Sequence, residues 1–215
     1  LDSVAPAWLT EVRRFNISAR EAARTLGAIC GASAATRIGF EGDIQNAVHA
    51  WFTGAKHGDG AALGGAVRHI GRAFEDLIKG VYETIETKKT GIKTLNEMLG
   101  QVCGRLNEVA PDYEPQLLEE VSQLLRRLRN ASTHEQTSPE FGRIRARLST
   151  ELLLATSEYF RILHGKGLIR VTTAGMAEGR YEFNGTPGDL YFFGLDGDDT
   201  GRELERLLQG GFSEE

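Results

Sequence analysis

An arginine, an asparagine and a histidine stand close together in the stretch RLRNASTHEQ. Arg129 is followed at once by Asn130, and His134 comes four residues later. A neutral histidine can accept or donate a proton near pH 7, and the planar fork of an arginine matches the oxygens of a phosphate. An asparagine amide can hold a neighbouring side chain in place. This combination suits attack of a hydroxyl on phosphorus, with the histidine moving the proton and the arginine neutralising the phosphate oxygens.

Further arginines flank this motif. They are Arg126, Arg127, Arg143, Arg145 and Arg147, against two acidic residues, Glu135 and Glu140. The chain as a whole has a formal net charge of -5, so its overall charge gives no argument for binding a polyanion. Contact with nucleic acid would therefore be local, and we take Arg126, Arg127 and Arg143 as the candidate RNA-binding residues.

Three helices are expected to lead up to the motif. Apolar residues at helical spacing predict a strongly amphipathic helix over AVRHIGRAFEDLIKGVYETIE from Ala66, a second helix from Gly91, and a third over 116–129. The motif then stands where the third helix is expected to end. On the first of these helices, Glu75 and Asp76 are candidates for an acidic side chain that faces the motif.

A fourth helix is expected behind the motif. Thr137 and Glu140 bracket Ser-Pro in a capping-box pattern. The positions expected to face inward on this helix are Phe141, Ile144, Leu148, Leu152, Ala155, Tyr159 and Leu163. Four helices with short connections predict an up-and-down bundle over 61–165.

Residues 1–60 predict accessory helices and a connector. Ser18 and Glu21 form a capping-box pattern ahead of AARTLGAIC, and a second apolar stretch follows from Ile44. The run TGAKHGDGAALGG, over 53–65, holds five glycines and is interpreted as a loop. It lacks the Gly-Lys-Ser/Thr ending of a phosphate-binding loop, so we favour a flexible connector.

Residues 166–215 change to short β-rich runs. LIRVTT, RYEFN and LYFFG are separated by glycine-containing turns, which predicts a small antiparallel β meander followed by a terminal helix from about Thr200. The expected fold is thus mainly α, with N-terminal helices, a helical bundle and a β meander at the C-terminal end.

The motif and the helix order together resemble the HEPN ribonuclease family. The signature of that family is R-x4-6-H, often R-N-x3-H, and it stands here as Arg129, Asn130 and His134. The resemblance covers about 66–164 and implies a HEPN-like bundle whose third helix ends in the motif. Carried over residue by residue, it implies that His134 acts as general acid or base, that Arg129 holds the scissile phosphate and that Asn130 orients the pair.

The resemblance also implies a reaction and an assembly. It implies a homodimer in which two motifs form one cleft for single-stranded RNA, and cleavage by the RNA's own 2′-hydroxyl without a metal or other cofactor. The resemblance leaves open whether such an enzyme would act in antiviral defence, as a toxin or in RNA processing. Gln136 stands where the toxin branch that pairs with nucleotidyltransferase antitoxins usually has a tyrosine, so such an antitoxin is not implied. The alternative is a non-catalytic HEPN-like module that binds nucleotide, RNA or a protein partner. The N-terminal helices and the meander are candidates for sensing, dimerisation or binding a regulatory protein.

The remaining features point to an intracellular protein without a metal site. Cys30 and Cys103 are two isolated cysteines in helical context, which suits reduced core thiols and a cytoplasmic location. No apolar run approaches membrane-spanning length. The spacing of His49, His57, Asp59 and His69 matches no metal-ligand pattern.

Overall fold

The computed structural model describes residues 6–29, 34–85, 93–134, 138–166 and 168. Within these ranges the chain forms six α-helices and one short 3-10 helix. The helices are α1 (Ala7–Ile29), α2 (Ala34–His57), α3 (Gly60–Ile85), α4 (Leu95–Val109), η1 (Pro111–Tyr113), α5 (Leu117–His134) and α6 (Pro139–Gly165). The prediction of a mainly α fold is confirmed for this part of the chain.

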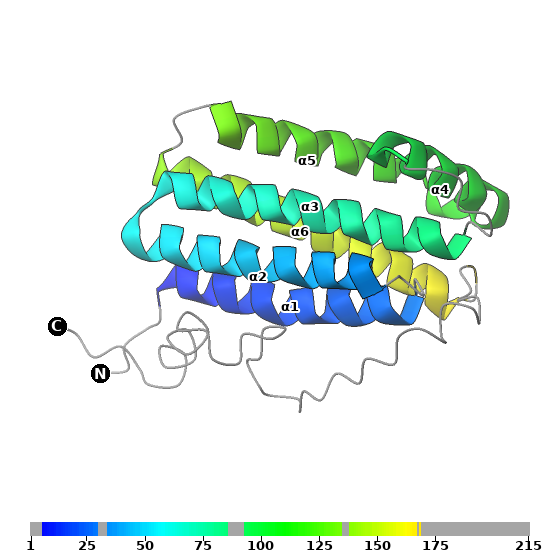
Figure 1. The fold of residues 1–215 in the computed structure, drawn as a ribbon, viewed down its shortest axis with the longest axis horizontal. Helices are drawn as coiled ribbons and strands as arrows, with labels where there is room; N and C mark the ends of the chain where they lie inside the picture. Colours follow the sequence, from blue (N-terminus) through cyan, green and yellow to red (C-terminus); the bar gives the residue numbers. More distant parts are fainter. Residues whose placement is uncertain (1–5, 30–33, 86–92, 135–137, 167, 169–215) are drawn as a thin grey trace.

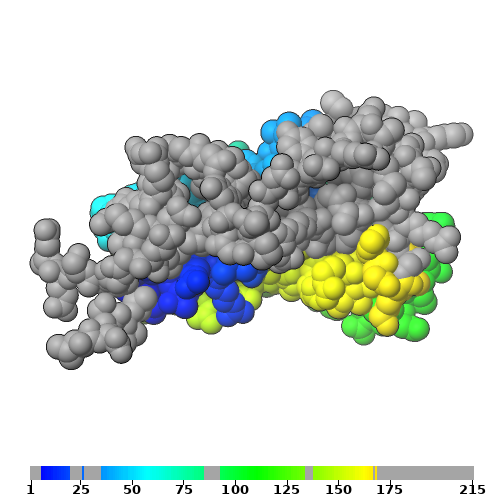
Figure 2. All heavy atoms as spheres, turned by 90° about the horizontal axis from the view of Figure 1, so that it is seen from below, coloured from blue at the N-terminus to red at the C-terminus, as the bar shows by residue number. Residues whose placement is uncertain are grey.

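The long helix α3 lies at the centre of the molecule (Figure 1). It packs with α1, α2 and α6 in a bundle, while α4 and α5 cover it on the other side. α1 and the last turns of α6, blue and yellow in Figure 2, both lie at the molecular surface. The core is built from large side chains of several helices, including Phe15, Phe40, Trp51, Phe74 and Phe160. Burial of such apolar side chains is the main force that holds the helices together.

The helices on the two sides of residue 60 share one core. Phe40 and Ile44 of α2 are fully buried in the same cluster as Ile70 and Leu77 of α3. The division into N-terminal helices over 1–60 and a bundle over 61–165 stays a prediction about chain organisation. In the structure, α1 and α2 pack directly against α3 and α6.

The expectation of a flexible loop over 53–65 was wrong. α2 runs to His57 and α3 begins at Gly60, so the connection is only Gly58 and Asp59. Gly58 has a φ of 65°, which favours glycine at the end of a helix. Oδ1 of Asp59 accepts hydrogen bonds from the backbone N–H groups of Ala61 at 2.8 Å and of Ala62 at 3.2 Å, which caps α3.

Glycines of this run allow close packing between helices. A Cβ added to Gly54 would lie 2.6 Å from Cγ of Leu63. A Cβ added to Gly64 would lie 2.9 Å from the carbonyl oxygen of Ser132 on α5. Such distances leave no room for a side chain, so these glycines permit contact between neighbouring helices and do not mark a loop.

Several expected helix ends also lie elsewhere. Ser18 is inside α1 and does not begin a helix, and α2 starts at Ala34, ten residues before Ile44. α5 does not end at Arg129 but continues to His134, so the whole motif is helical. The N-cap of α6 is Ser138, whose Oγ accepts from the backbone N–H of Phe141 at 3.3 Å.

The prediction of which α6 residues face inward was wrong in the first half of the helix and again at Ala155, which is exposed. Phe141, Ile144 and Leu148 are 60%, 48% and 49% exposed. The buried face consists instead largely of small and hydroxyl residues: Gly142, Ala146, Ser149, Thr150, Leu153, Thr156, Ser157, Phe160 and Leu163. Thr150 satisfies its hydroxyl by donating to the carbonyl oxygen of Ala146 at 2.8 Å. Small side chains allow α6 to approach α3 closely, which is why counting large apolar residues selected the wrong face.

The β meander and terminal helix expected over 166–215 lie outside the described residues, apart from residues 166 and 168. In the part of the chain that is described there is no strand. No helix there is long and apolar enough to cross a lipid bilayer. Cys103 is buried as expected and its thiol donates to the carbonyl oxygen of Pro115 at 3.3 Å, whereas Cys30 lies outside the described residues.

Candidate functional site

A hollow of about 370 Å³ lies between α3, the start of α4 and α5. Its lining residues are Arg68, Gly71, Phe74, Glu75, Leu95, Asn96, Ser122, Leu125, Arg126, Arg129, Asn130 and Thr133. Three predicted site residues, Arg126, Arg129 and Asn130, thus line one surface. The fold brings them together with Arg68 from a different helix.

Helical periodicity explains why α5 presents these residues together. Arg126, Arg129, Asn130 and Thr133 stand at positions i, i+3, i+4 and i+7, which share one face of a helix. The hydroxyl of Thr133 donates to the carbonyl oxygen of Arg129 at 2.9 Å, one turn back. Arg126, Asn130 and Thr133 on this face are exposed. Leu118 and Leu125 of the same helix are buried in the core.

Arg129 is held across the hollow by Glu75 of α3. Nη1 of Arg129 lies 3.3 Å from Oε1 of Glu75, and both side chains are a little under half exposed. Gly71 stands one turn before Glu75, and a Cβ placed there would lie 3.8 Å from Cδ of Arg129. The apolar stem of Arg129 therefore passes over the small Gly71, and its guanidinium remains accessible to solvent.

The end of α5 is fixed by a close approach to α3. The carbonyl oxygen of Ser132 lies close to Gly64, where a Cβ would be only 2.9 Å away. This contact is next to Thr133 and within one turn of Arg129. A side chain at position 64 would have to push the last turn of α5 away from α3.

Arg127 and Arg143 do not line the hollow in the described part of the chain. Arg127 is exposed on α5. Nη2 of Arg143 lies 3.8 Å from Oε2 of Glu11 on α1, so this arginine is directed to another helix interface. RNA binding by these two residues stays a prediction, and the structure does not group them with Arg129.

His134 is the last residue of α5, and its side chain lies outside the described part of the structure. Its backbone follows Asn130 by one helical turn, which places the two positions on the same face of α5. The position of the third motif residue along the helix is therefore fixed by the backbone.

Sequence reasoning missed several residues of the hollow, among them Arg68, Asn96 and Ser122. Arg68 belongs to the strongly amphipathic helix, but its place beside the motif depends on how α3 is rotated against α5, which the helical pattern does not show. Asn96 could not have been found, because its proximity depends on how α4 begins beside α3 and α5. Of the two acidic candidates named from the sequence, Glu75 faces the motif.

The other acidic candidate, Asp76, lies against α2. A Cβ on Gly39 would be 2.6 Å from Oδ2 of Asp76. Burial raises the pKa of Asp76 to about 6, and the carboxylates of Asp43, Glu75 and Glu83 act in the same direction while Lys79 opposes them. Asp76 does not line the hollow, so Glu75 alone of these two is placed to act on Arg129.

The hollow is suited to an anion with several acceptor oxygens. Within the described ranges, three guanidinium groups and one carboxylate line it, and guanidinium donors bind phosphate oxygens well. The amides of Asn96 and Asn130, which are exposed, add hydrogen-bonding groups for a base or a sugar. Among the described residues, no three histidine, cysteine or acidic side chains are grouped in a way that could hold a metal ion.

No protein-family model, curated protein or solved structure matches this chain significantly.

Proposed function

We propose that this chain is an endoribonuclease of the HEPN type that cleaves single-stranded RNA at the hollow between α3 and α5. The observation that carries the proposal is the convergence of Arg126, Arg129 and Asn130 with Arg68 on one accessible surface. His134 ends the same helix one turn after Asn130. The proposal also rests on the resemblance of the R-N-x3-H sequence to the motif of that family.

The proposed reaction is an attack by the RNA on itself. The 2′-hydroxyl loses its proton to a base and forms a new bond to the adjacent phosphorus, while the bond to the 5′-oxygen breaks. The leaving oxygen takes a proton, so the products end in a 2′,3′-cyclic phosphate and a 5′-hydroxyl. In this scheme His134 transfers a proton and the guanidinium of Arg129 neutralises charge on the phosphate oxygens.

Each chain supplies one motif histidine, whereas the reaction needs one proton acceptor and one donor. A two-fold symmetric homodimer would provide both, one from each subunit. Exposed apolar side chains support such an assembly. Leu124 is exposed on α5, the helix that contains the motif, and Phe141, Ile144 and Leu148 are exposed on the next helix, α6. The single-stranded RNA would then occupy a cleft shared by two copies.

A direct test is to incubate the purified protein with end-labelled single-stranded RNA in the presence of EDTA. We expect cleavage to continue, because the proposed proton transfers and the charge neutralisation use side chains of the motif. The 5′ fragments should carry 2′,3′-cyclic phosphate ends. Products with 3′-hydroxyl ends, or cleavage that strictly requires magnesium, would reject the mechanism.

A non-catalytic RNA-binding module is the second candidate function. The contact of Arg129 with Glu75 supports it, because that ion pair gives Arg129 a structural role in joining α5 to α3. The regular helix through the motif supports it as well. RNA that binds to the hollow with no cleavage at any salt or pH would favour this alternative.

A further inference from the structure

The hollow between α3 and α5 is larger than one phosphate group needs. Its volume is about 370 Å³, whereas a cavity of about 150 Å³ already holds a whole six-membered ring. The proposed reaction places the scissile phosphate at Arg129, and a phosphate fills only part of this space. The hollow therefore has room for the sugar and base of a nucleotide as well.

Charged and uncharged lining residues occupy different parts of the hollow. Ser122 precedes Arg129 by seven residues on α5, which is about 10 Å along the helix axis, and Arg126 stands between them. α4 lies beside the end of α5 where that helix begins (Figure 1). The first residues of α4, Leu95 and Asn96, add to the uncharged part. A nucleotide is divided in the same way, into a charged phosphate and an uncharged base.

The fold itself does not use the side chain of Asn96. α4 begins with a capping box, in which Oγ1 of Thr94 accepts from the backbone N–H of Glu97 at 3.3 Å and Oε2 of Glu97 accepts from that of Thr94 at 2.7 Å. Asn96 stands inside this first turn, is exposed, and has no hydrogen-bond partner among the described residues. Its amide therefore presents both a donor and an acceptor to the hollow.

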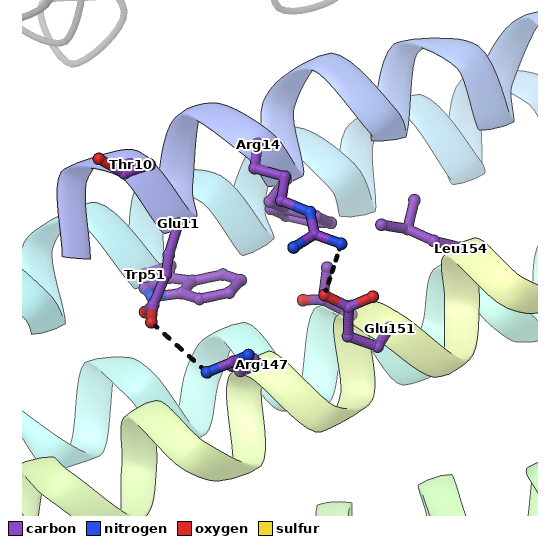
Figure 3. A pocket seen from close by; sticks show the side chains of 9 residues that line it. Thr10, Glu11, Arg14, Trp51, Arg147, Glu151 and Leu154 are labelled. Atoms are coloured by element: carbon purple, nitrogen blue, oxygen red, sulfur yellow. Dashed lines mark ion pairs between the residues drawn. The ribbon is translucent and has the colours of Figure 1, made fainter. Parts of the chain in front are cut away.

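Another hollow with arginines, between α1 and α6, differs in size and charge (Figure 3). Its volume is about 150 Å³. Nη2 of Arg14 lies 3.5 Å from Oε1 of Glu151, and Nη1 of Arg147 lies 4.0 Å from Oε1 of Glu11, so arginines there face glutamates. By contrast, Arg126 has no ion pair among the described residues and keeps its guanidinium for a phosphate. The hollow between α3 and α5 is the better fit for a nucleotide.

We propose, on the basis of the function proposed for this hollow, that it holds a whole nucleotide of the RNA, with the base at the start of α4 and Asn96 in contact with the edge of that base. Unstacked bases of single-stranded RNA are commonly read by hydrogen bonds to their edges. An asparagine amide offers a donor beside an acceptor, which matches such an edge. The half-buried Leu95 adds an apolar surface for the ring. Asn96 then sets the base preference next to the cleaved bond.

Small ligands test the base contact without any cleavage. Ligand-observed NMR compares the four nucleoside 5′-monophosphates with ribose 5-phosphate, which has the same phosphate and sugar but no base. We expect at least one nucleotide to bind about three- to tenfold more tightly than ribose 5-phosphate, as for one hydrogen bond. Equal binding of ribose 5-phosphate and all four nucleotides would overturn the proposal.

Variants separate the base contact from the phosphate contact. Asn96→Ala should remove the advantage of nucleotides over ribose 5-phosphate, whereas Arg126→Gln should weaken both kinds of ligand alike. Asn107→Ala is the matched control, because Asn107 is an exposed asparagine of the same helix that does not line the hollow. Circular dichroism checks that each variant is folded. A nucleotide preference that survives Asn96→Ala, or that Asn107→Ala removes equally, would place the base contact elsewhere.

Asn96→Asp tests the direction of the effect. A carboxylate only accepts hydrogen bonds, and guanine presents two adjacent donors, its N1–H and its amino group. The variant should therefore raise the affinity for guanosine monophosphate relative to uridine monophosphate. An acidic residue in the first turn of a helix is favourable, so the fold should be kept. An unchanged ratio of the two affinities in the folded variant would contradict the proposal.

RNA cleavage distinguishes failure of this base contact from failure of the proposed function. Sequencing the fragments of a random RNA pool cut by wild-type and Asn96→Asp protein should show a shift toward guanine beside the cut. Nucleotide binding that depends on Asn96, with no RNA cleavage, would support the base contact and refute the endoribonuclease. Cleavage whose base preference is the same in wild-type and Asn96→Asp protein would keep the endoribonuclease and refute the base contact.

Discussion

Replacing Glu75 by glutamine should tighten RNA binding, because it releases Arg129 and removes the carboxylate that, among the described residues, lines the hollow between α3 and α5. The two side chains are 44% and 43% exposed and their closest atoms are 3.3 Å apart, so solvent weakens the pair. Exposed pairs of this kind contribute about 0.2–1 kcal/mol. The folding stability of Glu75→Gln should therefore change by less than about 1 kcal/mol, and RNA affinity should rise up to about fivefold at low salt.

Fluorescence anisotropy with a labelled single-stranded RNA measures this effect in a His134→Ala background that prevents cleavage. The gain should shrink as salt is raised, because counterions screen the lost carboxylate. Glu158→Gln is the matched control, since Glu158 also contacts an exposed arginine but lies on α6 away from the hollow. Unchanged or weaker RNA binding by Glu75→Gln would refute the assignment of this hollow as the phosphate site.

Three further predictions concern packing, pH and assembly. Gly64→Ala should move the last turn of α5, because its Cβ would lie 2.9 Å from the carbonyl oxygen of Ser132. It should lower the free energy of unfolding, measured by denaturant titration, by about 1–3 kcal/mol, and it should also lower RNA cleavage. Gly100→Ala, whose Cβ would meet no atom within 4 Å, should not destabilise the protein in that titration. Asp76→Asn should raise the free energy of unfolding at pH 7 by about 1–2 kcal/mol after allowance for solvent. The pKa of Asp76 in the folded protein, about 6, exceeds the ordinary 3.8, so the wild-type protein loses stability as the pH rises from about 4 to 6. The advantage of the asparagine variant should therefore vanish below about pH 4. Mixing inactive His134→Ala subunits with wild-type subunits should reduce cleavage more steeply than simple dilution if two subunits form one site, whereas a straight line would indicate independent sites.

The sequence predicted the composition of the fold better than its packing. The apolar pattern of α3 identified a core helix correctly, because large buried residues such as Ile70, Phe74 and Leu77 recur at helical spacing. It failed for the first half of α6, where small residues are buried and Phe141 is exposed. The interpretation of the run around Gly64 as a loop was also wrong, because the sequence alone does not distinguish a glycine at a close contact between helices from a glycine in a loop.

The candidate site was predictable only along one helix. The spacing of Arg126, Arg129 and Asn130 on α5 follows from helical geometry and can be read from the sequence. The addition of Arg68 and the choice of Glu75 over Asp76 depend on how α3 is rotated against α5 and α2. Such rotations arise from packing between distant segments, which local sequence patterns do not encode.

The most direct test of the proposed activity compares RNA cleavage by three single variants with the wild-type protein. His134→Ala and Arg129→Ala remove the proposed proton-transfer group and the proposed phosphate ligand, and Arg161→Ala is a control at an exposed arginine outside the hollow. We predict that the first two lose at least about a hundredfold in cleavage rate in EDTA while their unfolding transitions remain, and that the control keeps its rate. Wild-type cleavage rates in folded His134→Ala and Arg129→Ala would contradict the proposed site.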